Sequence, residues 1–126
     1  MPFVRIDLAK GKPADYRRGI GEIVYKAMTE LINVPVDDKF QVITEHAPEE
    51  LNFPRSYLGA EYSHDIIFIQ ITLNAGRTVE MKQAFYKRVA DDLHTQLKVR
   101  REDVIINLVE TAKENWSFGN GIAPYA

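Results

Sequence analysis

The sequence predicts an α+β fold in which a duplicated β-α-β unit forms a four-stranded mixed sheet with two helices on one face. Three observations lead to this prediction: the two halves match, each half reads as strand, helix and strand, and the length fits one domain. The match aligns Phe3 with Phe68 and runs without a gap between 1–45 and 66–110. Identical aligned pairs include Phe3/Phe68, Ile6/Ile71, Leu8/Leu73, Gly11/Gly76, Val24/Val89, Asp38/Asp103 and Glu45/Glu110.

Length and composition fit one globular domain. We expect a single domain over 1–126, made of a first unit (1–45), a second unit (66–110) and a C-terminal tail (111–126). With 27% charged residues and a net charge of −2, the chain lacks the basic excess of a nucleic-acid-binding protein. It also lacks an apolar run that would span a bilayer and a signal-peptide core. We therefore expect no nucleic acid or membrane partner and a cytoplasmic location.

The residue types limit the chemistry further. The sequence contains no cysteine, which excludes disulfides and thiolate catalysis. Its three histidines, His46, His64 and His94, lack the short spacings typical of zinc sites, and His46 is more typical of a structural histidine than of a base. We therefore expect no metal site.

In the first unit, the sequence predicts a strand over 2–8, a helix after Pro13 and a strand over 39–45. Proline suits the first turn of a helix, where its missing N–H would have no partner. The helix is expected to be amphipathic and to end at 33–35, because apolar residues recur at helical spacing before an Asn-Val-Pro run. These apolar residues are Ile20, Ile23, Val24, Ala27, Met28, Leu31 and Ile32.

The second unit opens at 66–73 with a nearly continuous apolar run, which is typical of a central strand covered on both faces. Thr78 is a good N-cap for a helix that extends to about Lys98, and a final strand is expected over 103–110. Polar residues replace part of the apolar face of this helix, so we expect it to be the more exposed of the two. The replacements are Arg88, Asp92 and Gln96.

A strand-helix-strand connection within one sheet is a right-handed parallel crossover. The simplest arrangement of two such units places their first strands antiparallel at the centre of the sheet. Pro2 would then lie beside 73–77, whereas a ferredoxin-like strand order would separate them. The face without helices needs a cover, and self-association is the simplest one.

Pro2 is the first candidate for chemistry. If Met1 is removed, Pro2 becomes a secondary amine, and burial in an apolar pocket would lower the pKa of such an amine so that it could act as a base. The alternative is structural, because a proline is tolerated at the first position of a strand. If Met1 is retained, the Pro2 nitrogen is an amide and cannot be a base.

Arg77 and Asp38 are the other candidate catalytic residues. Arg77 follows Gly76 at the end of the third expected strand, where a guanidinium could hold a carboxylate or stabilise an enolate. Asp38 precedes the second strand and could orient the substrate or hydrogen-bond the amine. Both have simpler explanations: Lys12 occupies the matching loop, and Asp103 occupies the matching turn.

Two segments fall outside the aligned region. The connection 47–63 is long, and such loops commonly line a site or meet a partner. The tail carries Trp116 and Phe118 in a glycine-rich turn, where they could wall a pocket and keep its dielectric constant low, or simply pack on the core.

Taken together, these features make the chain similar to the tautomerase superfamily, the group of proteins that resemble 4-oxalocrotonate tautomerase. The most similar branch contains malonate semialdehyde decarboxylase and uncharacterised tautomerase relatives. The resemblance covers nearly the whole chain, and the stretches that carry it are Met1-Pro2, 34–41, 74–78, 103–106 and 115–119.

The resemblance implies a homotrimer with the sheets wrapped inside, and cofactor-free keto–enol chemistry on a small keto acid. It assigns catalytic roles to Pro2, Asp38 and Arg77, and pocket walls to Trp116 and Phe118. The decarboxylase pattern has an Arg-x-Arg pair where this chain has Ala75-Gly76-Arg77, so tautomerisation is favoured over decarboxylation. A decarboxylase or hydratase, and a trimeric binding protein without catalysis, remain the alternatives.

Overall fold

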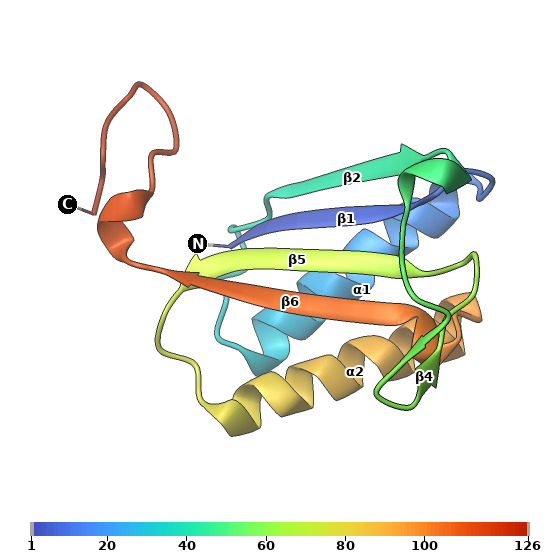
Figure 1. The fold of residues 1–126 in the computed structure, drawn as a ribbon. Helices are drawn as coiled ribbons and strands as arrows, with labels where there is room; N and C mark the ends of the chain where they lie inside the picture. Colours follow the sequence, from blue (N-terminus) through green and yellow to red (C-terminus); the bar gives the residue numbers. More distant parts are fainter. Residues whose placement is uncertain (1, 126) are drawn as a thin grey trace.

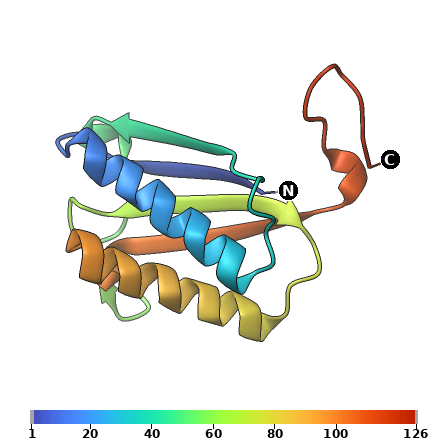
Figure 2. The same cartoon turned by 180° about the vertical axis from the view of Figure 1, so that it is seen from behind.

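The computed structural model describes residues 2–125 and shows a four-stranded sheet with both helices on one face (Figure 1). From behind, the two helices lie side by side across the sheet (Figure 2). The elements are β1 (Phe3–Ala9), α1 (Ala14–Leu31), β2 (Gln41–His46), β3 (Ser56–Tyr57), β4 (Ala60–Glu61), β5 (Ile67–Asn74), α2 (Val79–Leu97) and β6 (Val104–Thr111), with three short 3₁₀ helices, η1 (Pro48–Glu50), η2 (Arg101–Asp103) and η3 (Lys113–Asn115).

The strand order is β2-β1-β5-β6, which confirms the arrangement with the first strands of the two units antiparallel at the centre. Within each unit the two strands are parallel, β1 with β2 and β5 with β6. Phe3 pairs with Thr72 across the centre. The antiparallel register therefore places Pro2 at the end of the sheet where β5 ends, as the sequence predicted.

The helices differ in burial as expected. In α1 six residues are buried, namely Ile20, Gly21, Ile23, Val24, Ala27 and Met28. In α2 only Phe85, Val89 and Leu93 are buried. The Thr78 hydroxyl caps α2 by accepting a hydrogen bond from the Met81 N–H at 3.1 Å, and Lys98 ends the helix in the left-handed conformation.

The structural repeat is longer than the aligned halves. The 3₁₀ helix η1 follows β2 as η3 follows β6, so the connection after the first unit and the start of the tail are also equivalent. Between η1 and β5 the chain adds a small antiparallel hairpin, β3–β4, which the sequence did not predict. The equivalent segments are therefore 2–53 and 67–118.

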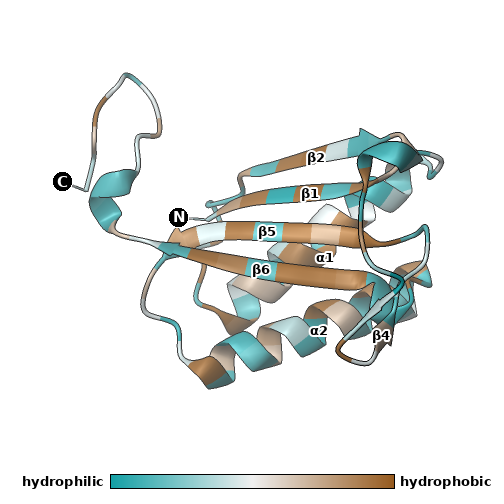
Figure 3. Ribbon diagram, in the orientation of Figure 1, coloured by the Kyte–Doolittle hydropathy of each residue, from teal (hydrophilic) through white to brown (hydrophobic). Residues whose placement is uncertain are grey.

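Side chains alternate between two faces of the sheet. On β1 and β5 the residues facing the helices are fully buried, namely Val4, Ile6, Leu8, Ile67, Ile69, Ile71 and Leu73. Figure 3 shows hydrophobic residues along much of β5 and β6. The opposite face of the sheet carries no helix (Figure 1). Val42 and Val109 are 40% and 39% exposed on the two outer strands. We call this surface the open face.

Among the described residues, neither helix has the length and apolar character needed to cross a membrane. Within the same part of the chain, no group of three or more His, Asp or Glu residues has an arrangement that would hold a metal ion.

Candidate active site

Pro2 is buried and lines a pocket of about 410 Å³ at the end of the sheet where β1 begins. The neighbouring residues come from three segments: the start of β1, the start of β2, and the tail after η3. The complete lining is Pro2, Phe3, Lys39, Phe40, Gln41, Val42, Trp116, Ser117 and Phe118.

Strand pairing explains why the start of β2 lies here. Because Val4 pairs with Gln41 in parallel, the residues before Gln41 lie beside the residues before Val4. The Val4 N–H donates to the Phe40 carbonyl at 3.0 Å. Lys39 ion-pairs with Glu22 of α1, which holds its ammonium beside the helix. A continuous hydrogen-bonded backbone thus fixes Phe40 next to Pro2.

The tail supplies an aromatic wall. The rings of Trp116 and Phe118 stack with an interplanar angle of 6° and a centroid separation of 5.3 Å. Phe118 also contacts Phe40 with centroids 5.6 Å apart, and Tyr125 edge-on with centroids 6.4 Å apart. The four rings place a large apolar surface beside a pocket that Pro2 lines.

Trp116 is tied to the end of the central strands. Its indole Nε1–H donates to Asn74 Oδ1 at 2.8 Å and to Thr111 Oγ1 at 3.0 Å. Asn74 ends β5 and Thr111 ends β6. The position of the aromatic wall therefore depends on polar side chains at the ends of these two strands.

Arg77 lies in the loop after β5, at the same end of the sheet as Pro2. Its Nε donates to the Ile32 carbonyl and its Nη1 to the Asn74 carbonyl, both at 2.8 Å. Burial lowers the pKa of Arg77 below its ordinary value, and the carboxylate of Glu110 opposes this shift. An arginine with a lowered pKa is still cationic at neutral pH. Arg77 is not among the residues that line the Pro2 pocket in the single chain.

Asp38 lies in the turn before β2 and is half-buried. Its N–H donates to the Pro35 carbonyl at 3.0 Å, which closes the turn. Its equivalent in the second unit, Asp103, has a structural role: it is fully buried and accepts hydrogen bonds from the N–H and the hydroxyl of Ser63 at 2.8 and 2.5 Å. The two equivalent aspartates thus have different surroundings.

The structure brings together Pro2, Trp116 and Phe118 in one pocket, and places Arg77 and Asp38 at the same end of the sheet outside its lining. Phe40 and Asn74 were not predicted from the sequence as site residues. The parallel register of β1 and β2 was the available signal for Phe40, because it places 39–41 beside the start of β1. The bond from Trp116 to Asn74 had no sequence signal.

The fold is shared with solved structures of known enzymes. The structure of FG41 malonate semialdehyde decarboxylase inhibited by 3-bromopropiolate superposes with a TM-score of 0.89 at 34% identity, covering 98% of this chain and 93% of that chain. Native fused 4-OT superposes with a TM-score of 0.78 at 18% identity, covering 96% of this chain and 95% of that chain, and shows the fold alone.

Sequence comparison identifies the family. Two family profiles described as "Tautomerase enzyme" match residues 38–119 and 2–55. The chain is 42% identical over 123 residues to "Probable tautomerase YusQ" of Bacillus subtilis (strain 168), covering 98% of this chain and 97% of that relative. It is 27% identical over 125 residues to "Probable tautomerase YrdN" of the same organism, covering 99% and 96%. The chain belongs to the tautomerase family and is an enzyme of the isomerase type.

Proposed function

We propose that this enzyme interconverts the keto and enol forms of a small α-keto acid, with the Pro2 amine as the general base. The observation that carries the proposal is the burial of Pro2 in a pocket walled by Phe40, Trp116 and Phe118. Apolar walls disfavour the cationic form of an amine, which lowers its pKa and leaves a neutral base near pH 7. The proposal requires removal of Met1.

In this mechanism the neutral Pro2 nitrogen takes a proton from the carbon next to the substrate carbonyl. The C–H electron pair moves into the new carbon–carbon double bond, and the carbonyl oxygen becomes an enolate. The prolinium then returns the proton to the oxygen or to another carbon, so atoms and electrons balance without a cofactor.

Arg77 is proposed to hold the substrate carboxylate and to stabilise the enolate. A guanidinium carries five N–H donors, and the bonds to Ile32 and Asn74 use one on Nε and one on Nη1. The remaining donors suit a carboxylate, whose geometry matches the guanidinium. Asp38 is proposed to orient the substrate or the amine from the turn beside Lys39.

The test joins intact-mass measurement of protein made in cells to an enol-ketonisation assay of the wild type, Pro2→Ala and Arg77→Ala. We expect a mass without Met1, a loss of at least about tenfold in kcat for Pro2→Ala because a mobile primary amine replaces the ring-held secondary amine as the base, and a rise in KM for Arg77→Ala. If the protein has lost Met1 and both variants match the wild type, the proposed roles of Pro2 and Arg77 are wrong.

Decarboxylation of a β-keto acid is the second candidate, favoured by the 34% identity to a malonate semialdehyde decarboxylase. In that reaction, or in hydration, protonated Pro2 would act as an acid. A direct comparison of a β-keto acid with the enol of an α-keto acid distinguishes the candidates. We expect faster turnover of the enol, because this chain has Ala75 where the decarboxylase pattern has a second arginine.

We also propose that the enzyme is a cytoplasmic homotrimer. The open face supports self-association, because Phe40, Val42 and Val109 remain exposed there in the single chain. Trimeric fused 4-OT shares the fold. Light scattering coupled to size exclusion should give three times the 14.4 kDa chain mass, and a monomer at micromolar concentration would contradict this assignment.

A further inference from the structure

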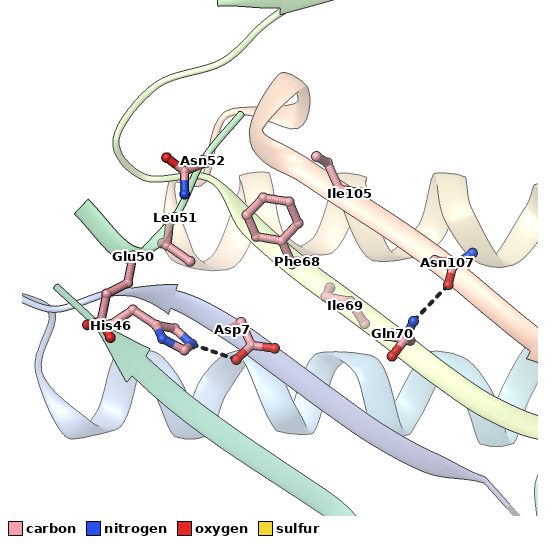
Figure 4. A pocket seen from close by; sticks show the side chains of 10 residues that line it. All are labelled: Asp7, His46, Glu50, Leu51, Asn52, Phe68, Ile69, Gln70, Ile105 and Asn107. Atoms are coloured by element: carbon pink, nitrogen blue, oxygen red, sulfur yellow. Dashed lines mark hydrogen bonds and ion pairs between the residues drawn. The ribbon is translucent and has the colours of Figure 1, made fainter. Parts of the chain in front are cut away.

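The structural repeat gives the protein a second pocket, equivalent to the Pro2 pocket but at the opposite end of the sheet. In the single chain, this second pocket has a volume of about 420 Å³ and lies between the open face and the segment after β2 (Figure 4). Phe68 and Ile105 line it as Phe3 and Phe40 line the first pocket. Leu51 follows η1 at the position that Trp116 occupies after η3. The same elements thus build both pockets.

The two pockets differ in chemistry. The second unit has Ile67 at the position of Pro2, inside the chain, so no amine is present there. Instead, His46 Nε2 lies 2.6 Å from Asp7 Oδ1, and both side chains are about three-quarters buried, at 25% and 29% exposure. In the second unit, the positions equivalent to His46 and Asp7 are Thr111 and Thr72. A carboxylate–imidazole pair has replaced two hydroxyl side chains.

Hydrogen-bond acceptors line the second pocket. The Gln70 Nε2 donates to Asn107 Oδ1 at 3.0 Å, which leaves the Gln70 carbonyl oxygen on the side of Asp7 (Figure 4). Glu50 adds a second carboxylate, one oxygen of which accepts from the Ala47 N–H at 2.9 Å. Within the described part of the chain, no lysine or arginine lines this pocket. Arg5, opposite Gln70 on the neighbouring strand, is outside this lining, so the carboxylates of Asp7 and Glu50 make the polar side of the pocket favourable to a positive charge.

We propose that this second pocket binds a small organic cation, with an ammonium group between Asp7 and Gln70 and an apolar body against Phe68 and Leu51. An ammonium brings several N–H donors to the carboxylate and the amide oxygen, and an aromatic ring beside it adds a cation–π contact. A metal ion fits less well, because no metal-holding cluster occurs among residues 2–125. Binding here is separate from the chemistry at Pro2.

Titration calorimetry on the full-length protein tests this, with benzylammonium, benzyl alcohol and benzoate as probes of one shape and three charges. We expect benzylammonium to bind at least tenfold more tightly than the other two. Asp7→Asn should weaken it at least tenfold, and Asp15→Asn, which changes an exposed carboxylate on α1, should leave it unchanged. Ketonisation activity should be unaffected by Asp7→Asn.

A second variant keeps the proposal testable if Asp7→Asn does not fold. Leu51→Trp fills the second pocket with the residue found at the equivalent place in the first, and should abolish benzylammonium binding. Leu58→Trp, at a residue 91% exposed in the β3–β4 turn, is the matched control. Equal affinity for the three probes, preference for benzoate, or binding that survives Leu51→Trp would overturn the proposal.

Discussion

The indole N–H of Trp116 donates a 2.8 Å hydrogen bond to Asn74, a residue 42 positions earlier at the end of β5. The bond connects the tail, which extends beyond the end of the sheet in Figure 1, to the central strand next to β1. The backbone carbonyl of the same asparagine accepts from Arg77. One residue therefore contacts both the aromatic wall and the proposed carboxylate-binding cation.

Asn74→Ala should loosen the aromatic wall. The indole retains its bond to Thr111, so we expect a stability loss of about 1 kcal/mol, the net value of one hydrogen bond. We expect kcat/KM to fall by more than this small loss of stability explains. The emission of Trp116, the only tryptophan in the sequence, should shift to the red and be quenched more strongly by acrylamide. Asn107→Ala is the control. It removes a side-chain hydrogen bond from Gln70 elsewhere on the sheet and should leave the emission unchanged.

Phe118→Ala should shift the pH dependence of the reaction. Removing the ring admits water to the Pro2 pocket, so the pKa of the Pro2 amine should rise toward the ordinary value of an α-amine, about 7.7–8. The acidic limb of kcat/KM, where activity rises as Pro2 loses its proton, then moves to higher pH, and each unit of movement lowers the neutral fraction at pH 6–7 about tenfold. Measurement of kcat/KM between pH 5 and 9 checks this.

The control for that variant is Phe53→Ala. Phe53 is the equivalent of Phe118 in the first unit, where it packs edge-on against Tyr62 with centroids 6.2 Å apart and does not line the Pro2 pocket. Its removal should leave the pH profile in place. If both variants shift the profile equally, the effect comes from general loosening rather than from the wall.

Periodicity in the sequence was sufficient to predict the sheet and helices, because apolar spacing reports which face of each element is buried. The aligned halves, 1–45 and 66–110, ended too early, because the equivalence continues into the loop and the tail. Beyond Glu45 and Glu110 three further pairs are identical, Ala47/Ala112, Glu49/Glu114 and Phe53/Phe118, and they reveal that the loop and the tail are equivalent.

The side-chain geometry of the site had no such signal. The strand order placed Arg77 at the same end as Pro2. The direction of its guanidinium, however, depends on the Ile32 carbonyl at the end of α1, which accepts a hydrogen bond from Arg77 Nε. The spacing of apolar residues in the sequence does not predict this bond. The β3–β4 hairpin has only two residues in each strand and was too short to produce an alternating pattern. These features are set by tertiary packing.

Tyr16 should make the fold sensitive to alkaline pH. Burial, followed by the charges of Asp65 and Asp103, raises the pKa of Tyr16 from 10.0 to about 12. Between these values an unfolded chain loses the phenol proton and the folded chain keeps it, so the free energy of unfolding falls as pH rises. Below pH 10 both states are protonated and the residue contributes no pH dependence.

Thermal melts of the wild type and Tyr16→Phe between pH 9 and 12 check this prediction. The wild type should lose stability more steeply, and the two curves should converge with rising pH because phenylalanine has no proton to lose. Tyr57→Phe, at a residue 61% exposed, should follow the wild type. Parallel curves for Tyr16→Phe and the wild type would contradict the raised pKa.

The equivalent aspartates should respond in opposite ways to the same substitution. Asp103→Asn leaves Ser63 with a weaker acceptor in a fully buried place, and we expect a loss of about 2 kcal/mol in the free energy of unfolding. Activity per folded molecule should be retained.

Asp38→Asn, in a half-buried turn, should lower the free energy of unfolding by less than about 1 kcal/mol yet lower kcat/KM at least tenfold if Asp38 acts on the substrate. Urea denaturation and ketonisation kinetics on both variants separate the two effects. If Asp38→Asn loses stability and keeps its kinetics, Asp38 is structural like its counterpart, and the catalytic assignment reduces to Pro2 and Arg77.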